Sequence, residues 1–179
     1  MCSALPTRSN LVALLLLLAA GPLAAQTSPN SPPRIHPRQG MWINAGLGAG
    51  FGEGMGGGSG NLAVGGTFGP HYLLGVGTSD WRMGIDRATL TMGTLDLRTQ
   101  VYPEVSGGFF LTGGLGLGYF WMSDSGTGPD VGSGVLLGLG YDARIGENTS
   151  ITTFINKVWI DTPDPRGSVA QVGVGISFH

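Results

Sequence analysis

One short stretch constrains the fold of this chain more than any other. Residues 113–121 read GGLGLGYFW, in which Leu115 and Leu117 alternate with glycine before three aromatic residues follow. A period of two is that of a β-strand, whose successive side chains point to opposite faces. One face of this strand would carry leucine, while the other face carries almost no side chain. The fold must therefore supply a suitable environment for two very different faces.

The same period of two recurs from residue 41 to the end of the chain, with no convincing 3.6-residue period of a helix. The periodic segments are bounded by Gly, Pro, Asp and Ser, which are typical turn residues. We therefore predict an all-β fold of eight antiparallel strands in up-and-down order. The predicted strands are Met41–Gly52, Gly60–Gly69, His71–Thr78, Ala88–Tyr102, Gly108–Met122, Gly134–Ile145, Ser150–Ile160 and Val169–Phe178.

The predicted connections alternate in length. Three are short turns: Gly69-Pro70, Pro103–Gly107 and Gly146–Asn148. Four are longer and more polar: Glu53–Ser59, Ser79–Ile85, Ser123–Ser133 and Asp161–Ser168. An even strand number with short turns at one end and longer loops at the other is typical of a transmembrane β-barrel in a bacterial outer membrane. Both chain ends would then lie on the periplasmic side.

The first 40 residues differ in composition from the rest. Arg8 precedes the apolar run LVALLLLLAAGPLAA, which predicts a secretory signal peptide over residues 1–25 with cleavage after Ala25. Cys2 is the only cysteine and would leave with this segment, so we expect no disulfide or thiolate chemistry in the mature chain. Residues 26–40 are rich in proline and predict a periplasmic tether. The barrel domain is then expected over residues 41–179.

The two faces of the clearest strands differ in chemistry. In the fifth, sixth and eighth predicted strands, one face holds no charged residue, whereas the other holds glycine, hydroxyl groups, an amide and an Asp/Arg pair. A soluble barrel should show a surface rich in Lys and Glu, but charged residues make up only 11% of this chain and glycine contributes 34 residues. We favour a membrane barrel with lipid outside and a narrow, glycine-rich polar lumen. The alternative is a soluble periplasmic barrel of lipocalin type. The faces of the seventh strand, residues 150–160, are ambiguous.

Aromatic residues cluster near the predicted strand ends. Tyr119, Trp121 and Trp159 lie toward the loop end, as does Trp81, which is expected within a loop. Tyr102 and Tyr141 lie toward the turn end. Aromatic girdles at both membrane interfaces are typical of membrane barrels. We therefore predict that these residues mark the two membrane interfaces.

Four charged residues are expected inside the barrel. Asp96 and Arg98 lie two apart on the fourth predicted strand, and Asp142 and Arg144 lie two apart on the sixth. Because buried charges require partners, we predict a crossed network of the two pairs that closes the lumen. The alternative is a gated path for small ions.

Other candidate sites are weak. Gly52, Gly54 and Gly57 formally match a dinucleotide motif, but a strand rather than a helix is expected to follow. His36, His71 and His179 share no predicted strand face, so no metal site, cofactor or catalytic residue is expected. The net charge of −2 gives no basic footprint for nucleic acid.

The last strand carries a family resemblance. The segment QVGVGISF, residues 171–178, resembles the β-signal of bacterial outer-membrane proteins, with Gln171, Gly173, Ile176 and Phe178 at the matching positions. It departs from the pattern because His179 follows the aromatic residue that usually ends such chains. Residues 41–179 therefore resemble the small eight-stranded outer-membrane barrels, the outer-membrane-protein-A and porin-like group.

This resemblance implies a non-enzymatic, monomeric integral protein of the outer membrane. Its implied role is structural or surface contact with a closed lumen, and the alternative is a narrow porin-like channel for small solutes. The implied partners are outer-membrane lipid and lipopolysaccharide, together with the barrel-assembly machinery and periplasmic chaperones during biogenesis. No nucleic acid is expected as a partner.

Overall fold

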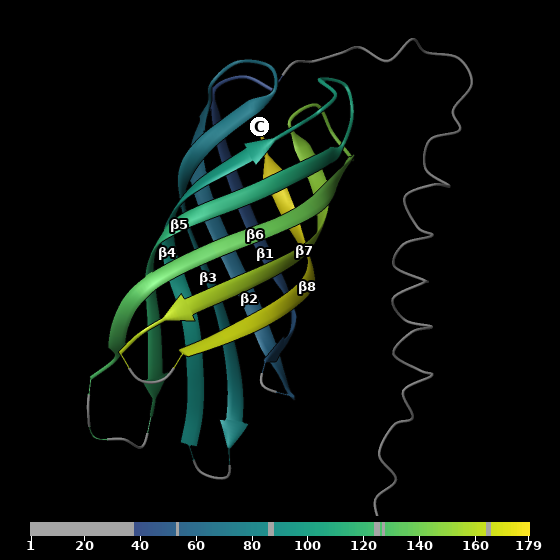
Figure 1. Ribbon diagram of the computed structural model, residues 1–179. Helices are drawn as coiled ribbons and strands as arrows, with labels where there is room; N and C mark the ends of the chain where they lie inside the picture. Colours follow the sequence, from purple (N-terminus) through teal and green to yellow (C-terminus); the bar gives the residue numbers. More distant parts are fainter. Residues whose placement is uncertain (1–37, 53, 86–87, 124–125, 127, 164–165) are drawn as a thin grey trace, which may run out of the picture. The chain divides into compact units, whose positions relative to one another are not determined.

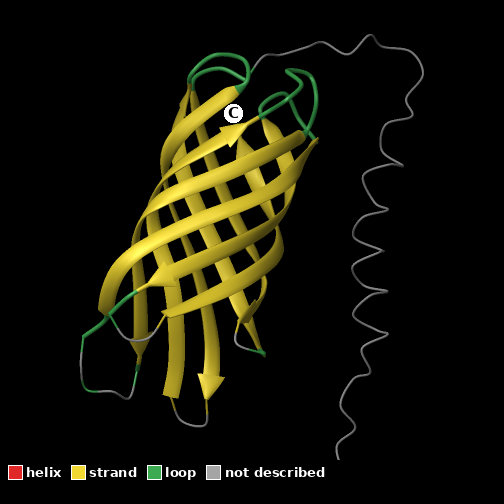
Figure 2. Cartoon of the chain, viewed as in Figure 1, coloured by secondary structure: helices red, strands yellow, loops and turns green. Residues whose placement is uncertain are grey.

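The strands close into a barrel. The computed structural model describes residues 38–179 except 53, 86–87, 124–125, 127 and 164–165. Within these residues each strand pairs antiparallel with its neighbours in sequence, and β8 returns to β1 (Figure 1; Figure 2). The strands are β1 (Met41–Gly52), β2 (Met55–Thr67), β3 (Tyr72–Ile85), β4 (Ala88–Val101), β5 (Phe109–Met122), β6 (Asp130–Arg144), β7 (Thr149–Asp161) and β8 (Arg166–Phe178). The predicted eight-stranded up-and-down barrel is confirmed.

The signal peptide predicted over residues 1–25 and the tether up to residue 37 lie outside the described residues. In the part of the chain that is described, no helix is both long enough and apolar enough to span a bilayer.

The outward face of the barrel is strongly apolar. Leu47 is 77% exposed, and Leu97 and Leu115 are each 67% exposed. Pairing also resolves the seventh strand, because Thr152 lies opposite the inward Asp142, which leaves Ile151 and Ile155 facing outward. The alternation of β5, β6 and β8 places the faces as their sequence pattern predicts.

Several strands are longer than predicted, and the extensions of β2 and β3 change the expected loops most. β2 begins at Met55 and β3 ends at Ile85, so most of the expected loops over residues 53–59 and 79–85 is strand. Regular pairing with β1 and β4 holds these segments, because sheet context overrides weak strand propensity. Gly54 makes the short β1–β2 connection possible, since its φ of 79° lies in the left-handed region.

The predicted difference in connection length was wrong. At the end with the chain termini, the strands are joined by residues 68–71, 102–108 and 145–148. At the opposite end, residues 53–54, 86–87, 123–129 and 162–165 separate the strands. The two sets are of similar length because the hairpins at the loop end continue as paired strands.

Side chains fill the barrel interior in layers. The layer nearest the loop end is an apolar cluster of Trp81, Met83, Leu90, Met92, Leu136, Val158, Ile160 and Val169. A second cluster of Trp42, Ala63, Leu73, Tyr102 and Phe110 lies near the chain termini. Trp81 is 1% exposed, so its expected place in a loop at the membrane interface was wrong. It points inward because residues 79–85 continue the alternation of β3.

The inward glycines serve two purposes. A Cβ atom on Gly116 of β5 would collide with the carbonyl oxygen of Leu95 on β4, so close approach of the two strands requires glycine there. On Gly114 it would lie 2.5 Å from Oδ1 of Asp96, so this glycine makes room for a large inward group. The space over the glycines of GGLGLGYFW is therefore occupied by neighbouring backbone and by the Asp96 side chain of β4.

Candidate functional site

The middle of the interior holds one complete ion pair. Nε and Nη2 of Arg98 donate to Oδ1 and Oδ2 of Asp96 at 2.9 and 2.8 Å. Oγ1 of Thr94 donates to Oδ2 of Asp96 at 2.9 Å. All three residues point inward from β4, and each is at most 3% exposed. This bidentate pairing gives both carboxylate oxygens of Asp96 a hydrogen-bond donor from the same strand.

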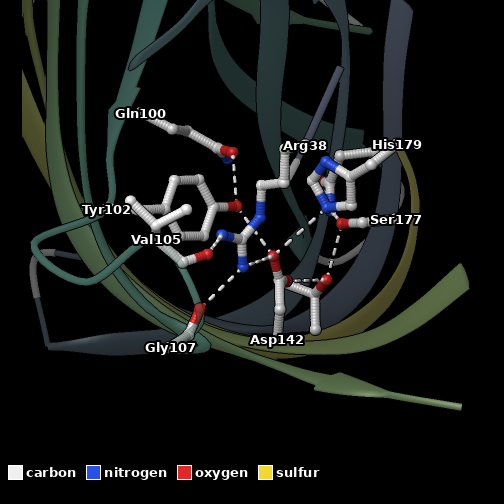
Figure 3. Close-up of polar contacts among 10 residues, drawn as sticks. Arg38, Gln100, Tyr102, Val105, Gly107, Asp142, Ser177 and His179 are labelled. Carbon is white, nitrogen blue, oxygen red and sulfur yellow. Dashed lines mark hydrogen bonds and ion pairs between the residues drawn. The ribbon is translucent and has the colours of Figure 1, made fainter. Parts of the chain in front are cut away.

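A second cluster surrounds Asp142 at the end of the barrel that holds the chain termini (Figure 3). Oη of Tyr102 donates to Oδ2 of Asp142 at 2.7 Å, and Oγ1 of Thr152 donates to Oδ1 at 2.6 Å. Nε2 of His179 lies 3.3 Å and Nη2 of Arg38 lies 3.9 Å from Oδ2. The buried carboxylate of β6 therefore gathers groups from four other parts of the chain.

Arg38 enters this cluster from the segment before β1. Its Nη1 and Nη2 donate to the carbonyl oxygens of Val105 and Gly107 at 3.3 and 2.8 Å. Its guanidinium carbon lies 3.5 Å from the ring centroid of Tyr102, a cation–π contact. Burial lowers the pKa of the Arg38 guanidinium, although the nearby Tyr102 and Asp142 oppose that shift.

The Tyr102 phenol is held in its neutral form. Burial is the main reason that the pKa of Tyr102 lies well above its ordinary value of 10, and the negative charge of Asp142 adds to the shift. The neutral hydroxyl is therefore the hydrogen-bond donor to the carboxylate.

The crossed network predicted from Asp96, Arg98, Asp142 and Arg144 was wrong. Asp96 and Arg98 pair with each other, and Arg144 is exposed at the end of β6. The basic side chains that approach Asp142 are those of Arg38 and His179. The spacing of two correctly predicted that Asp96, Arg98 and Asp142 face the interior. Arg144 has the same parity, but it is exposed because it is the last residue of β6.

Two further expectations need correction. Tyr102 was predicted at the membrane interface but is 1% exposed, because it continues the inward alternation of Arg98 and Gln100. Arg38 was expected in the tether over residues 26–40, yet it is 3% exposed inside the barrel. The alternation that places Asp96 and Arg98 inside carries a signal for Tyr102, which has the same parity, whereas Arg38 precedes the first period-two segment.

The other predicted interface aromatics lie on the outward face. Trp121 and Trp159 are 43% and 41% exposed near the loop end of β5 and β7. Tyr119 is half-buried because its ring lies over Gly93 on the neighbouring β4. Tyr141 is also half-buried and lies opposite Phe109, near the end of the barrel with the chain termini.

The residues of the predicted assembly signal lie on both faces of β8. Gln171 is buried, and its Nε2 donates to the carbonyl oxygen of Asp80 at 3.1 Å. Gly173 faces inward, while Ile176 and Phe178 are 46% and 49% exposed on the outside. His179, the departure from the family pattern, folds inward onto Asp142.

The buried acids of the interior are surrounded by protein partners. In the part of the chain that the structure describes, no three His, Cys, Asp or Glu side chains are grouped as metal ligands would be. Each buried carboxylate has cations and hydroxyl donors around it. The arrangement is suited to holding strands and chain ends together.

The fold is shared with solved outer-membrane barrels. Ail, the attachment invasion locus protein of Yersinia pestis, matches with a TM-score of 0.58 and 14% identity, covering 79% of this chain and 99% of Ail. Neisserial surface protein A matches with a TM-score of 0.59 and 12% identity, covering 77% of this chain and 96% of that one. The N-terminal β-barrel domain of Pseudomonas aeruginosa OprF matches with a TM-score of 0.51 and 14% identity, covering 78% and 98%. No protein-family model and no curated protein sequence matches the chain.

Proposed function

We propose that this protein is an integral, non-enzymatic barrel of a bacterial outer membrane, with a closed lumen and a structural or surface-contact role. The observation that carries the proposal is the contrast between its two faces. Large apolar side chains such as Leu47 and Leu115 are exposed on the outside, whereas the charged residues Asp96 and Arg98 are buried inside. A closed sheet with this polarity satisfies its backbone within lipid.

A soluble ligand-binding barrel fits these features less well. Its interior would need to hold an apolar ligand, but Trp42, Leu136 and Phe110 already fill the interior at 0–2% exposure. The single lysine of the chain, Lys157, faces outward on β7, two residues before Trp159. A lysine near the rim can extend its ammonium group to the lipid headgroups, so Lys157 is compatible with a lipid-facing surface.

The expected route to this membrane is the signal peptide over residues 1–25, followed by recognition of the last strand by the barrel-assembly machinery with periplasmic chaperones. The side of β8 that bears Ile176 and Phe178 remains exposed after closure. Outer-membrane lipid and lipopolysaccharide are then its surroundings, and we propose a monomer. The fold shared with Neisserial surface protein A supports a role at the cell surface.

Planar-bilayer recording of the refolded protein tests the closed lumen. We expect no steady conductance above the bare-bilayer baseline, because two side-chain clusters and an ion pair fill the interior. Steady single-channel steps would instead support the porin-like alternative. Fractionation of cells tests the location, since recovery in the soluble periplasmic fraction would contradict the membrane assignment.

A further inference from the structure

The two ends of the barrel domain meet at one buried acid. Arg38 lies three residues before Met41, the first residue of β1, and His179 directly follows Phe178, the last residue of β8. Both approach Oδ2 of Asp142, at 3.9 and 3.3 Å. The side chains of all three residues are at most 8% exposed.

Arg38 also reaches across the barrel opening. In a closed barrel of eight strands in sequence order, β1 lies opposite the β4–β5 connection. Gly40 anchors the segment beside β1, because its carbonyl oxygen accepts from the Thr67 amide at 3.0 Å. The Arg38 side chain then donates to Val105 and Gly107 in the β4–β5 connection. Figure 3 shows this guanidinium among Tyr102, Asp142 and the two carbonyl groups.

The opening is divided where this segment crosses it. A cavity of about 180 Å³ is lined by Arg38, Gln39, Arg144, Glu147, Asn148, Thr149, Ser150 and His179. A second cavity, of about 290 Å³, is lined by Arg38, Gln39, Gly40, Thr67, Gly69 and Pro70. Because Arg38 and Gln39 line both cavities, the segment separates them. Buried polar groups such as Ser177 and Thr152, at 3% and 1% exposure, belong to the same cluster.

We propose that residues 38–40 form a strap that closes the barrel opening at the end with the chain termini, locked by the contacts of Arg38 with Asp142, Tyr102 and the β4–β5 connection. The proposal rests on the proposed function only for the identity of the compartment that the strap faces. The strap locks after β8 has paired with β1, because that pairing places the segment before β1 beside the strands that carry Asp142 and His179. It shields the polar cluster from solvent and ties the preceding chain to the barrel.

Thiol labelling of a buried position tests the strap. In a Cys2→Ser background, Ser177→Cys places a thiol among the shielded groups, and the probe is a trimethylammonium methanethiosulfonate reagent. Adding Arg38→Gln should raise the labelling rate about tenfold or more, because local opening controls the reactivity of a buried group. Arg144→Gln is the matched control, since it removes an exposed cation from the same opening, and should leave the rate within about twofold.

The barrel itself must stay folded for this comparison, which is checked by its heat-modifiable migration on gels. Equal labelling rates in the Arg38→Gln and Arg144→Gln variants would overturn the strap, even if fractionation and conductance agree with an outer-membrane barrel. If Arg38→Gln does not fold, trypsin digestion of the unmodified barrel gives an independent answer. Trypsin must bind the arginine side chain in its specificity pocket, so cleavage after Arg38 should be absent in the folded form and rapid after heating.

The order of events can be followed with the same protease. During refolding into lipid vesicles, protection of the bond after Arg38 should appear together with the compact gel band. Protection that precedes the compact band, or cleavage that persists after it, would contradict locking by barrel closure.

Discussion

At the level of single residues, the buried carboxylates of Asp96 and Asp142 obtain their basic partners from different parts of the chain. Asp96 is paired within its own strand by Arg98, two residues away. Asp142 is instead approached by Arg38, which precedes β1, and by His179, which follows β8. Removing one partner of a buried pair leaves an uncompensated charge, which costs more than removing both.

We therefore predict strong coupling between Asp96 and Arg98. Arg98→Met alone should lower the free energy of unfolding by about 3–5 kcal/mol, because it leaves the Asp96 carboxylate buried without its cation. The double variant Asp96→Leu/Arg98→Met should lose clearly less than the sum of the two single variants. Urea titration in lipid vesicles measures both values.

Arg82→Met is the control, since the Arg82 side chain is 67% exposed and pairs with Asp80 on the outer face. Exposed ion pairs contribute little, so its effect should lie within about 1 kcal/mol of zero. Additive losses for the Asp96 and Arg98 variants would rule out an energetic coupling between them.

A second prediction at this scale concerns pH. The folded state raises the pKa of Tyr102 above the ordinary value of 10, so its stabilising effect is complete below pH 10 and declines above that pH as the unfolded chain loses its phenol proton. The expected decline is about 1.4 kcal/mol for each pH unit above 10. Tyr102→Phe should remove this decline and should cost about 1–2 kcal/mol at neutral pH through the lost hydrogen bond to Asp142.

Tyr72→Phe is the matched control, since that ring is 54% exposed on the outer face. Its unfolding free energy should follow the parent protein from neutral to alkaline pH. A Tyr102→Phe curve that falls as steeply as the parent curve above pH 10 would show that another group governs alkaline unfolding.

At the level of elements, the seam between β1 and β8 depends on close backbone approach. Gly48 of β1 lies opposite Gly173 of β8, and a Cβ atom on Gly48 would collide with the carbonyl oxygen of Val172. The contact partner is backbone, so it cannot rotate away as a side chain could. Glycine at this position is therefore part of how the last strand closes onto the first.

Gly48→Ala should destabilise the barrel by about 1–3 kcal/mol, because it overpacks the seam. Gly58→Ala on β2 is the control, since no atom lies within 4 Å of its added Cβ, and should change stability by less than about 0.5 kcal/mol. The fraction of compact, heat-modifiable protein after refolding and the urea midpoint measure the effect. Equal behaviour of the two variants would show that the strands can separate at the seam without cost.

At the level of the whole molecule, the barrel sorts its four tryptophans between two environments. Trp42 and Trp81 are 0% and 1% exposed inside, whereas Trp121 and Trp159 are 43% and 41% exposed on the outer face. If the outer face lies in lipid, the two pairs must differ in their contact with acyl chains. This difference provides a direct test of the membrane assignment.

Single-tryptophan variants, with the other three replaced by phenylalanine, make the test quantitative. In vesicles of brominated phospholipid, the fluorescence of Trp121 and Trp159 should be quenched strongly, while that of Trp42 and Trp81 should change little. Quenching depends on contact with the brominated chains, so buried rings are protected. Weak quenching of all four would contradict a lipid-facing outer surface.

Local sequence pattern determined the strands and their faces. Alternation such as that in residues 113–121 holds for each residue and its neighbours, because side chains in a strand must point to opposite sides. The positions of Leu115, Asp96, Arg98 and Asp142 on the correct faces follow from this rule. The faces of the seventh strand could not be assigned from its own sequence, because Ile151 and Phe154 have opposite parity and are both apolar. Its pairing with β6 shows that Phe154 faces inward and Ile151 outward.

The tertiary structure decided what lies beyond the alternation. The extension of β2 and β3 depends on pairing with neighbours across the hairpins, and the inward Trp81 follows from that extension. Thr152 lies opposite Asp142 in the β6–β7 pairing, and His179 follows β8 in the same run of paired strands. Arg38 precedes β1 and reaches Asp142 only when β8 closes onto β1. Sequence by itself determined which side chains face inward and which face outward, because that depends on a local period. The tertiary structure selected the partners of Asp142, because those contacts join residues far apart in the chain.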